Sequence, residues 1–333
     1  MPTIGSLCTG IGGLDLAVER HFGADLLWYS DIDPKANEVM AAHRPDALAL
    51  GDFTAVDPAT VEVPDILTAG FPCQPVSSAG KQKGTADERW LFNDIITFIE
   101  GLRSLPTWVV LENVRNLLSH DSGRTALEVF RQVAGLGFDI DYGVVRASEA
   151  GMPHQRARVF IVATHPDCLS EEGSPRCAQP PGRSLAGADG EAPTHPDGPG
   201  GEAREHPGRS RERLRLESLG CATPPTHPPR PERRDPQHEP LGEAGRPTSE
   251  PGERLGPSGW GDFWPAIERW ESLFGPAPHP ADDGRINPRF VEWMCGHEAG
   301  LVTDVIPQRT HALRLLGNSV CPPQAELALA LLT

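Results

Sequence analysis

A single cysteine, Cys73, stands in a setting that suits covalent chemistry better than core packing. It follows an apolar run at 64–69 that predicts a buried strand, and the chain turns at Gly70 just before it. Pro72 and Pro75 stiffen the backbone on both sides of the thiol. A lone cysteine is most often a small buried apolar residue, but this proline-rich turn makes a poor core. Because the thiolate is the reactive form of cysteine, we interpret Cys73 as a nucleophile.

Charged groups adjoin two later apolar runs. Glu112 ends the run at 107–111, and in a desolvated pocket the pKa of such a carboxyl rises, which lets it hold or donate a proton near neutral pH. The alternative is a carboxylate that caps the next helix. Arg156 and Arg158 are two residues apart, so both face one side of a strand, where arginine suits a carbonyl oxygen or a phosphate. Alternatively, the two arginines form salt bridges at the edge of a sheet.

A glycine-rich turn near the start of the sequence has the composition of a ligand-binding loop. Gly10, Gly12 and Gly13 lie between an apolar run and an amphipathic stretch. Glycine lets a ligand approach the backbone, and a helix N-terminus offers free N–H groups. Such turns also occur for packing reasons alone, so this motif needs support from elsewhere in the chain.

Carboxylates at the ends of the next two predicted strands give that support. Asp31 suits two ribose hydroxyls, as in dinucleotide-binding folds, and Asp52 beside Phe53 suits an adenine amino group next to an aromatic ring. A single carboxylate at a strand end is usually a turn residue or a helix cap. The glycine-rich turn, Asp31 and Asp52, at three successive strand ends, together favour a cofactor that carries a nucleoside.

The elements that must position these residues alternate between strands and helices from residue 2 to about 164. This alternation predicts an α/β fold, a doubly wound, mostly parallel Rossmann-like sheet with helices on both faces. The predicted strands are 3–7, 25–30, 66–69, 107–111, 142–146 and 158–163. The predicted helices include 14–21, 34–43, 91–102 and 123–134.

The composition changes between residues 165 and 259, where 18 of the 35 prolines fall. Such a segment buries too little apolar surface to offset the entropy of ordering, so we predict a disordered insert. Structure resumes at Trp260, with helices predicted at 262–274, after Asn287, and at 322–332. The last of these is apolar and needs a partner, which we expect to be the sheet. The predicted segments are therefore 1–164, 165–259, 260–309 and 310–333.

The net charge, the cysteine count and the lengths of the apolar runs restrict the classes of function. The net charge is −16, so any nucleic-acid-binding face has to be local. The seven cysteines are odd in number and form no Cys-x-x-Cys pair, which favours neither a disulfide framework nor a metal site. No apolar run approaches the ~18 residues of a membrane span. We predict a cytoplasmic protein with reduced thiols and no membrane partner.

Taken in order, four motifs resemble those of the cytosine-C5 DNA methyltransferase family of bacterial or phage type. They are Phe-Pro-Cys-Gln at 71–74, Glu-Asn-Val at 112–114, Arg-x-Arg at 156–158 and Gly-Asn-Ser-Val at 317–320. The resemblance covers 3–164 and 285–333. It implies S-adenosylmethionine as the cofactor of the domain at 1–164 and target recognition at 260–309. By position, the cofactor pocket would comprise Cys8, Gly10, Gly12, Gly13, Leu14, Asp31, Ile32, Asp52, Phe53, Pro72, Asn318 and Ser319.

The resemblance also implies the catalytic roles. Cys73 would add to C6 of cytosine, Glu112 would meet the N3–N4 edge of the base, and Arg158, with Arg156 beside it, would hold O2. The base would have to leave the duplex first. The loop after Cys73 would then close over it, with DNA contacts from Gln74, Ser77, Lys81, Lys83 and Arg89.

The implied partner is double-stranded DNA, bound by a monomer, with a cognate restriction endonuclease as a further candidate. Two alternatives share the same catalytic set. One is a tRNA cytosine-C5 methyltransferase, which the short recognition region favours. The other is a homologue that binds cofactor or DNA without turnover, against which the intact Cys73, Glu112, Arg158 and Asn318 argue.

Overall fold

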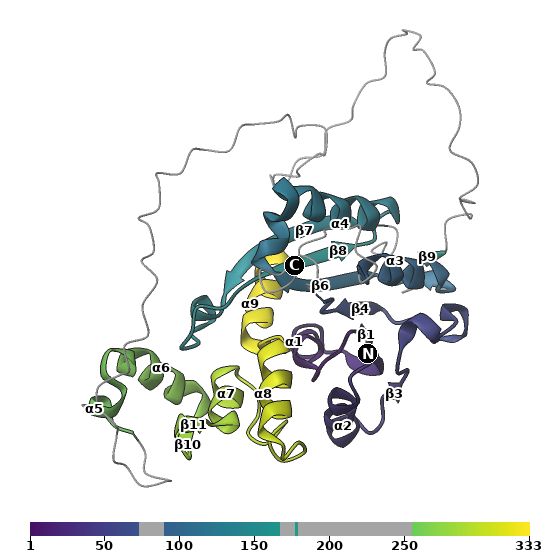
Figure 1. The fold of residues 1–333 in the computed structure, drawn as a ribbon. Helices are drawn as coiled ribbons and strands as arrows, with labels where there is room; N and C mark the ends of the chain where they lie inside the picture. Colours follow the sequence, from purple (N-terminus) through teal and green to yellow (C-terminus); the bar gives the residue numbers. More distant parts are fainter. Residues whose placement is uncertain (73–89, 167–176, 179–254) are drawn as a thin grey trace, which may run out of the picture. The chain divides into compact units, whose positions relative to one another are not determined.

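The computed structural model describes residues 1–72, 90–166, 177–178 and 255–333. All of them belong to one compact unit, formed by residues 1–182 and 247–333. A second unit, residues 183–246, lies wholly outside the described residues. Figure 1 labels the helices and strands along the chain, from purple at the start of the sequence to yellow at its end.

A seven-stranded sheet forms the centre of the unit, with the spatial order β3-β2-β1-β4-β6-β8-β7. Neighbours from β3 to β6 run parallel, whereas β8 runs antiparallel to both β6 and β7. This arrangement confirms the predicted mostly parallel, Rossmann-like sheet. The strands are β1 Thr3–Leu7, β2 Asp25–Ser30, β3 Leu48–Ala49, β4 Ile66–Ala69, β6 Trp108–Val114, β7 Asp139–Arg146 and β8 Ala157–Thr164.

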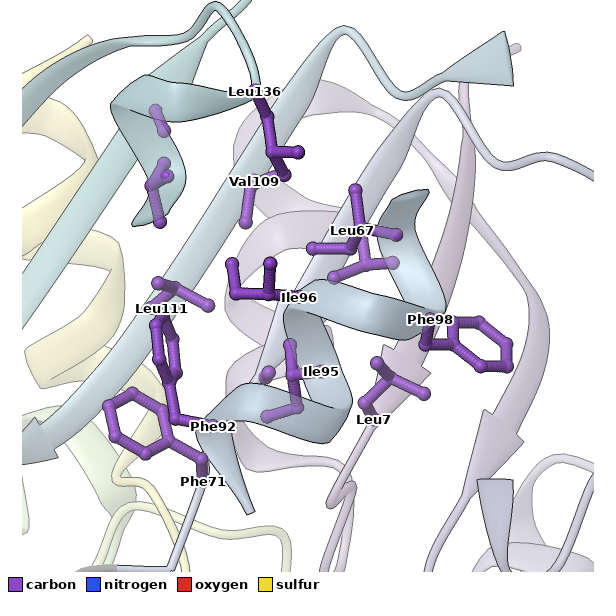
Figure 2. Packing of buried hydrophobic residues seen from close by; sticks show 14 of the residues in the cluster. Leu7, Leu67, Phe71, Phe92, Ile95, Ile96, Phe98, Val109, Leu111 and Leu136 are labelled. Atoms are coloured by element: carbon purple, nitrogen blue, oxygen red, sulfur yellow. The ribbon is translucent and has the colours of Figure 1, made fainter. Parts of the chain in front are cut away.

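Helices cover both faces of this sheet because its strands are apolar on both sides. In β6, Val109 and Leu111 join one buried cluster with α3 and α4, whereas Val110 joins another with α1 and α9. Figure 2 shows the first cluster, in which Ile95 and Ile96 of α3 lie close to the strand residues. The helices are α1 Gly13–Phe22, α2 Pro34–His43, α3 Phe92–Gly101, α4 Arg124–Gly135, α8 Arg309–Asn318 and α9 Pro322–Leu332.

Most predicted elements coincide with the observed ones. Strands 3–7, 25–30 and 66–69 and helices 34–43 and 322–332 match residue for residue. One boundary was wrong in a way that bears on the site. β6 continues to Val114, so Glu112 lies inside the strand, not after it, and caps no helix.

A small module precedes the last two helices. It contains α5 Pro257–Trp260, α6 Trp264–Phe274, the two-stranded β10 Ala281–Asp282 and β11 Arg285–Ile286, and α7 Pro288–Met294. Its core includes Ile267, Trp270 and Phe290. The Asn287 side chain accepts a hydrogen bond from the Arg289 N–H at 3.0 Å, which confirms the predicted helix start. Target recognition by this module stays a prediction.

Two short described pieces fall within the predicted insert. Helix α5 begins at Pro257, ahead of the expected restart at Trp260. Strand β9, Cys177–Ala178, pairs antiparallel with β5, Ser104–Leu105. The rest of residues 165–259 lies almost entirely outside the described residues, so its predicted disorder stays a prediction.

Helix α9 joins the last part of the sequence to the first. It packs against α1 and β7, and its apolar side chains share a cluster with Ile4 and Leu14. The buried Gln324 side chain donates hydrogen bonds of 2.8 Å to the carbonyls of Val145 and Arg156. The sheet is therefore the partner that the sequence required for this helix. None of the helices in the described part of the chain combines the length and apolar character that crossing a bilayer requires.

Candidate active site

The glycine-rich turn after β1 adopts a backbone that few residues tolerate. Gly10 and Gly12 have φ of 58° and 76°, in the left-handed region that favours glycine. Gly12 also caps α1. The turn is tied to the end of β2, because the Gly10 N–H donates to Asp31 Oδ2 at 2.7 Å. The N-terminus of α1 is therefore held beside the Asp31 carboxylate, so two of the positions predicted to bind a cofactor lie together.

Asp31 is arranged to accept further hydrogen bonds. Its Oδ2 accepts from Gly10, and its Oδ1 accepts from the Asp33 N–H at 2.8 Å. A carboxylate oxygen has two acceptor positions, so each oxygen keeps one for a ligand hydroxyl. Burial raises the pKa of Asp31, while the backbone donors of Asp33, Gly10 and Ile32 lower it. This geometry fits the two adjacent hydroxyls of a ribose.

Cys8 lies between this carboxylate and the next. Burial raises the pKa of its thiol, and the charges of Asp31 and Asp52 raise it further. Its φ of 52° places a residue with a side chain in the left-handed region. The thiol therefore stays protonated near neutral pH, which makes Cys8 a wall of the site and not a nucleophile.

Asp52 and Phe53 contact the protein itself. The exposed Asp52 carboxylate caps a short 3₁₀ helix, accepting from the Thr54 N–H at 3.0 Å and its hydroxyl at 2.7 Å. The Phe53 ring is buried, edge-on to Phe98. By contrast, Ile32 is 77% exposed, so its side chain is available to a flat ligand beside Asp31.

The segment after α8 closes onto the glycine-rich turn. A Cβ at Gly13 would lie 2.1 Å from the Val320 carbonyl oxygen, so the two backbones touch. Asn318 is exposed at the end of α8, whereas the Ser319 hydroxyl is buried and donates to the Leu316 carbonyl at 2.9 Å. Leu14 turns its side chain into the core under α9, so only its backbone borders the turn.

We expect Gly13→Ala to lower the free energy of unfolding by about 1–3 kcal/mol, because the added methyl collides with a backbone carbonyl that cannot rotate away. Chemical denaturation measures the change. Gly135→Ala is the matched control: that glycine also lies in a helix and is exposed, and its Cβ would meet nothing within 4 Å. Alanine there should raise stability by up to about 1 kcal/mol. Equal responses of the two variants would contradict the contact.

Glu112 and Arg158 form a buried ion pair on neighbouring strands. Arg158 Nε lies 2.9 Å from Glu112 Oε1, and Glu112 is 8% exposed. Burial raises the pKa of the Glu112 carboxyl, against the opposing charges of Arg158 and Arg156. The carboxyl is therefore placed to hold a proton, with a guanidinium beside it that can stabilise negative charge.

Asn113 connects this pair to the strand that leads to Cys73. Its Nδ2 donates to the Phe71 carbonyl at 3.1 Å, and β4 lies directly beside β6. The Phe71 ring packs against Trp90 and Phe92, as Figure 2 shows for the latter. The chain is thus fixed up to Phe71, next to Glu112. The sequence motif contained Asn113, but nothing local indicated this contact.

Arg156 contacts the last part of the sequence. Its guanidinium donates to the Gly317 carbonyl at 3.0 Å and to the Ser319 carbonyl. These bonds hold the segment that closes on Gly13, a positioning task that the sequence did not indicate. The predicted catalytic contact of Arg156 with a base is not needed to explain its placement.

Pro72 is exposed at the end of the described segment. The predicted residues beyond it lie outside the described residues: Cys73, Gln74, Ser77, Lys81, Lys83 and Arg89.

Comparisons with known proteins agree with this architecture. The model of the family described as C-5 cytosine-specific DNA methylase matches residues 3–186, more than half of the chain. The type II methyltransferase M.NlaX of Neisseria lactamica is 36% identical over 185 residues, which are 55% of this chain and 57% of that protein. M.HhaI of Haemophilus parahaemolyticus is 36% identical over 165 residues, 48% of each chain.

The chain thus spans about half the length of the curated relatives it matches. Among solved structures, the Entamoeba histolytica methyltransferase EhMeth superposes with a TM-score of 0.55 and 13% identity, over 98% of this chain and 96% of that one. This likeness concerns the fold alone. From the extent of the family match, the chain belongs to the C-5 cytosine-specific DNA methylase family.

Proposed function

We propose that this protein transfers a methyl group from S-adenosylmethionine to C5 of a cytosine in double-stranded DNA, through a covalent bond between Cys73 and C6 of the base. One observation carries the proposal. Glu112 lies on β6, directly beside the strand that leads to Cys73, and pairs with Arg158 of β8, while Asn113 ties β6 to the Phe71 carbonyl. A carboxyl and a guanidinium placed side by side match the N3 and O2 positions of a pyrimidine ring.

The described residues fit the cofactor. Asp31 has acceptor positions for ribose hydroxyls, and the turn leaves the helix N-terminus open to a ligand, because Gly10, Gly12 and Gly13 have no side chains and that of Ile11 is buried. Ile32 and Pro72 offer exposed apolar surface near the same strand ends. When bound, S-adenosylmethionine supplies an electrophilic methyl group on a sulfonium.

The residues of the chain make cytosine reactive. C5 of cytosine is a poor nucleophile, and addition of the Cys73 thiolate to C6 moves electron density onto C5. Glu112 holds a proton at N3 as the adduct forms, and Arg158 stabilises the negative charge that develops on O2. After methylation, loss of the C5 proton lets the bond to Cys73 break, which regenerates the thiolate.

The base has to be turned out of the duplex to reach this site, at a cost of a few kcal/mol. We propose that Gln74, Ser77, Lys81, Lys83 and Arg89 contact the DNA backbone once the base has entered. Local positive charge there reconciles DNA binding with a net charge of −16. The names of the type II relatives support a restriction–modification setting. We further propose that the protein works as a monomer in the cytoplasm, with a cognate endonuclease as partner.

A labelling experiment tests the proposal. The protein is incubated with S-adenosylmethionine carrying a labelled methyl group and either duplex DNA or tRNA, with Cys73→Ser as the control. We expect label in DNA cytosines only with the intact thiol. Label in tRNA alone would replace DNA by tRNA as the substrate. Cofactor binding without label in either nucleic acid would leave a non-catalytic homologue.

A further inference from the structure

His297 lies beside the predicted cofactor site but has no role in the mechanism above. It follows α7, and its ring is buried, with 2% of the residue exposed. Its Nε2 lies 2.9 Å from the Ser319 hydroxyl oxygen. Ser319 belongs to the segment that closes on the glycine-rich turn, so the ring touches the point where two distant parts of the sequence meet.

The hydrogen bonds of Ser319 determine which ring nitrogen carries the proton. The Ser319 hydroxyl donates its hydrogen to the Leu316 carbonyl at 2.9 Å, so towards His297 it can only accept. His297 Nε2 is therefore the protonated nitrogen and acts as the donor. Its Nδ1 has no hydrogen-bond partner in the described part of the chain.

The ring is neutral under ordinary conditions. Burial lowers the pKa of His297 to about 4, and the nearby Arg156 acts in the same direction, while Cys321 and Glu292 oppose them. A neutral ring with one fixed donor gives the hydrogen bond to Ser319 a constant direction. It also lets the rest of the ring act as apolar packing surface.

The same ring supports the glycine-rich turn. A Cβ at Gly13 would lie 3.3 Å from His297 Cε1 and 2.1 Å from the Val320 carbonyl oxygen. The ring also borders a cavity of about 250 Å³ whose wall includes Gly12, Leu16 and Met40. Removing the ring would therefore leave the start of α1 with space to move into.

The loop that carries His297 is rigid. The buried Glu292 carboxylate accepts from the N–H groups of Gly300, Val302 and Thr303 at 2.8, 2.7 and 3.1 Å, and from the Thr303 hydroxyl at 2.8 Å. The His297 N–H donates to the Glu292 carbonyl at 3.2 Å. The ring is thus held from behind and cannot withdraw from Ser319 and Gly13 without breaking these bonds.

We propose that His297 is a positioning residue for cofactor binding, which fixes the Ser319 segment against the Gly13 turn through its Nε2–H and its ring face. The inference rests on the proposed function and deepens it. The observed contacts of the ring are to Ser319 and Gly13, which would line the cofactor pocket, so His297 should affect the affinity for S-adenosylmethionine and leave the chemical step unchanged.

Three variants of the full chain test the proposal. His297→Leu keeps apolar bulk but removes the donor, and we expect the KM for S-adenosylmethionine to rise about tenfold with kcat nearly unchanged, as for one lost buried hydrogen bond. His297→Gln can place an N–H near the former Nε2 and should restore the KM to within about threefold. Ser319→Ala removes the acceptor and should raise the KM as His297→Leu does. Because Ser319 is itself a predicted cofactor residue, the double variant His297→Gln/Ser319→Ala is made as well, and it should show no recovery of the KM over Ser319→Ala alone.

Two further readouts do not depend on turnover. Calorimetry should show the same tenfold loss in the dissociation constant of S-adenosylmethionine. Amide hydrogen exchange of residues 10–15 should be faster in the cofactor-free His297→Leu protein than in the wild type. Val129→Ala is the control: it opens the core under α4, away from the site, and should lower the melting temperature without changing the KM.

The outcomes separate the two proposals. A wild-type protein that binds S-adenosylmethionine, with a His297→Leu variant that melts lower but keeps its KM, would overturn the positioning role alone. A proportional loss of kcat in His297→Leu, or no recovery in His297→Gln, would also overturn it. A wild-type protein that binds no S-adenosylmethionine would overturn the proposed function and this inference together.

Discussion

Duplex DNA that carries 5-fluorocytosine at the target position is expected to become covalently attached to the protein in the presence of S-adenosylmethionine. Fluorine at C5 cannot leave as a proton does, so the bond between Cys73 and C6 should persist once it has formed. The observed anchoring of Phe71 by Asn113 places the start of this segment next to Glu112, where the base edge would lie. Denaturing electrophoresis of labelled DNA measures the attachment, and peptide mass mapping identifies the residue.

Cys73→Ser should abolish this attachment completely while leaving cofactor binding intact. Cys221→Ser is the matched control, because that cysteine belongs to none of the motifs and should not matter. Attachment that survives in Cys73→Ser would show that another nucleophile is used. Methyl transfer to ordinary DNA by Cys73→Ser at the wild-type rate would remove the covalent mechanism altogether.

Glu112→Gln is expected to lower kcat for methyl transfer by about 10²–10⁴-fold, the usual range for loss of a proton-transferring group. Glutamine keeps the size of the side chain and one acceptor oxygen, but it cannot hold a proton at N3. Burial raises the pKa of this carboxyl, which is the property that the substitution removes. Single-turnover assays with saturating DNA and cofactor measure the chemical step directly.

An exposed ion pair of the same chemistry provides the control. Arg146 and Glu149 are 3.3 Å apart with side chains about half exposed, so Glu149→Gln should leave kcat unchanged. Glu112→Gln also leaves Arg158 partly buried without its counter-charge, and assays should therefore run well below the melting temperature of the variant. A folded Glu112→Gln protein with at least a tenth of the wild-type rate would exclude proton transfer by Glu112.

How much of the fold the sequence predicts depends on how far apart in the sequence the interacting residues lie. The strands at 3–7, 25–30 and 66–69 were predictable because each is a short segment centred on apolar residues and followed by turn residues. The end of β6 was not, because Glu112 and Asn113 interrupt the apolar pattern. The strand continues through them because Arg158 and the Phe71 carbonyl, both distant in sequence, satisfy their side chains.

The candidate site likewise combines residues that the local sequence identifies with residue pairs that only the fold brings together. Gly10, Gly12 and Asp31 were recognisable from their types and their positions at strand ends, and the structure brings them together. The bonds of Arg156 to the last part of the sequence, and of His297 to Ser319, join residues that nothing local relates. Single-sequence patterns carry no information on such pairs, because both partners are ordinary residues until the fold makes them neighbours.

The packing of α9 on α1 has a consequence for synthesis. Arg20 of α1 pairs with Glu326 of α9 at 2.9 Å although they are 306 residues apart. At about 5–20 residues per second, a ribosome needs on the order of 15–60 s to make the intervening chain. During that interval the surface of α1 that packs on α9 has no cover, which invites chaperone binding. The contact of Val320 with Gly13 can form only afterwards, so the cofactor site of a nascent chain should be complete only once Val320 has been made.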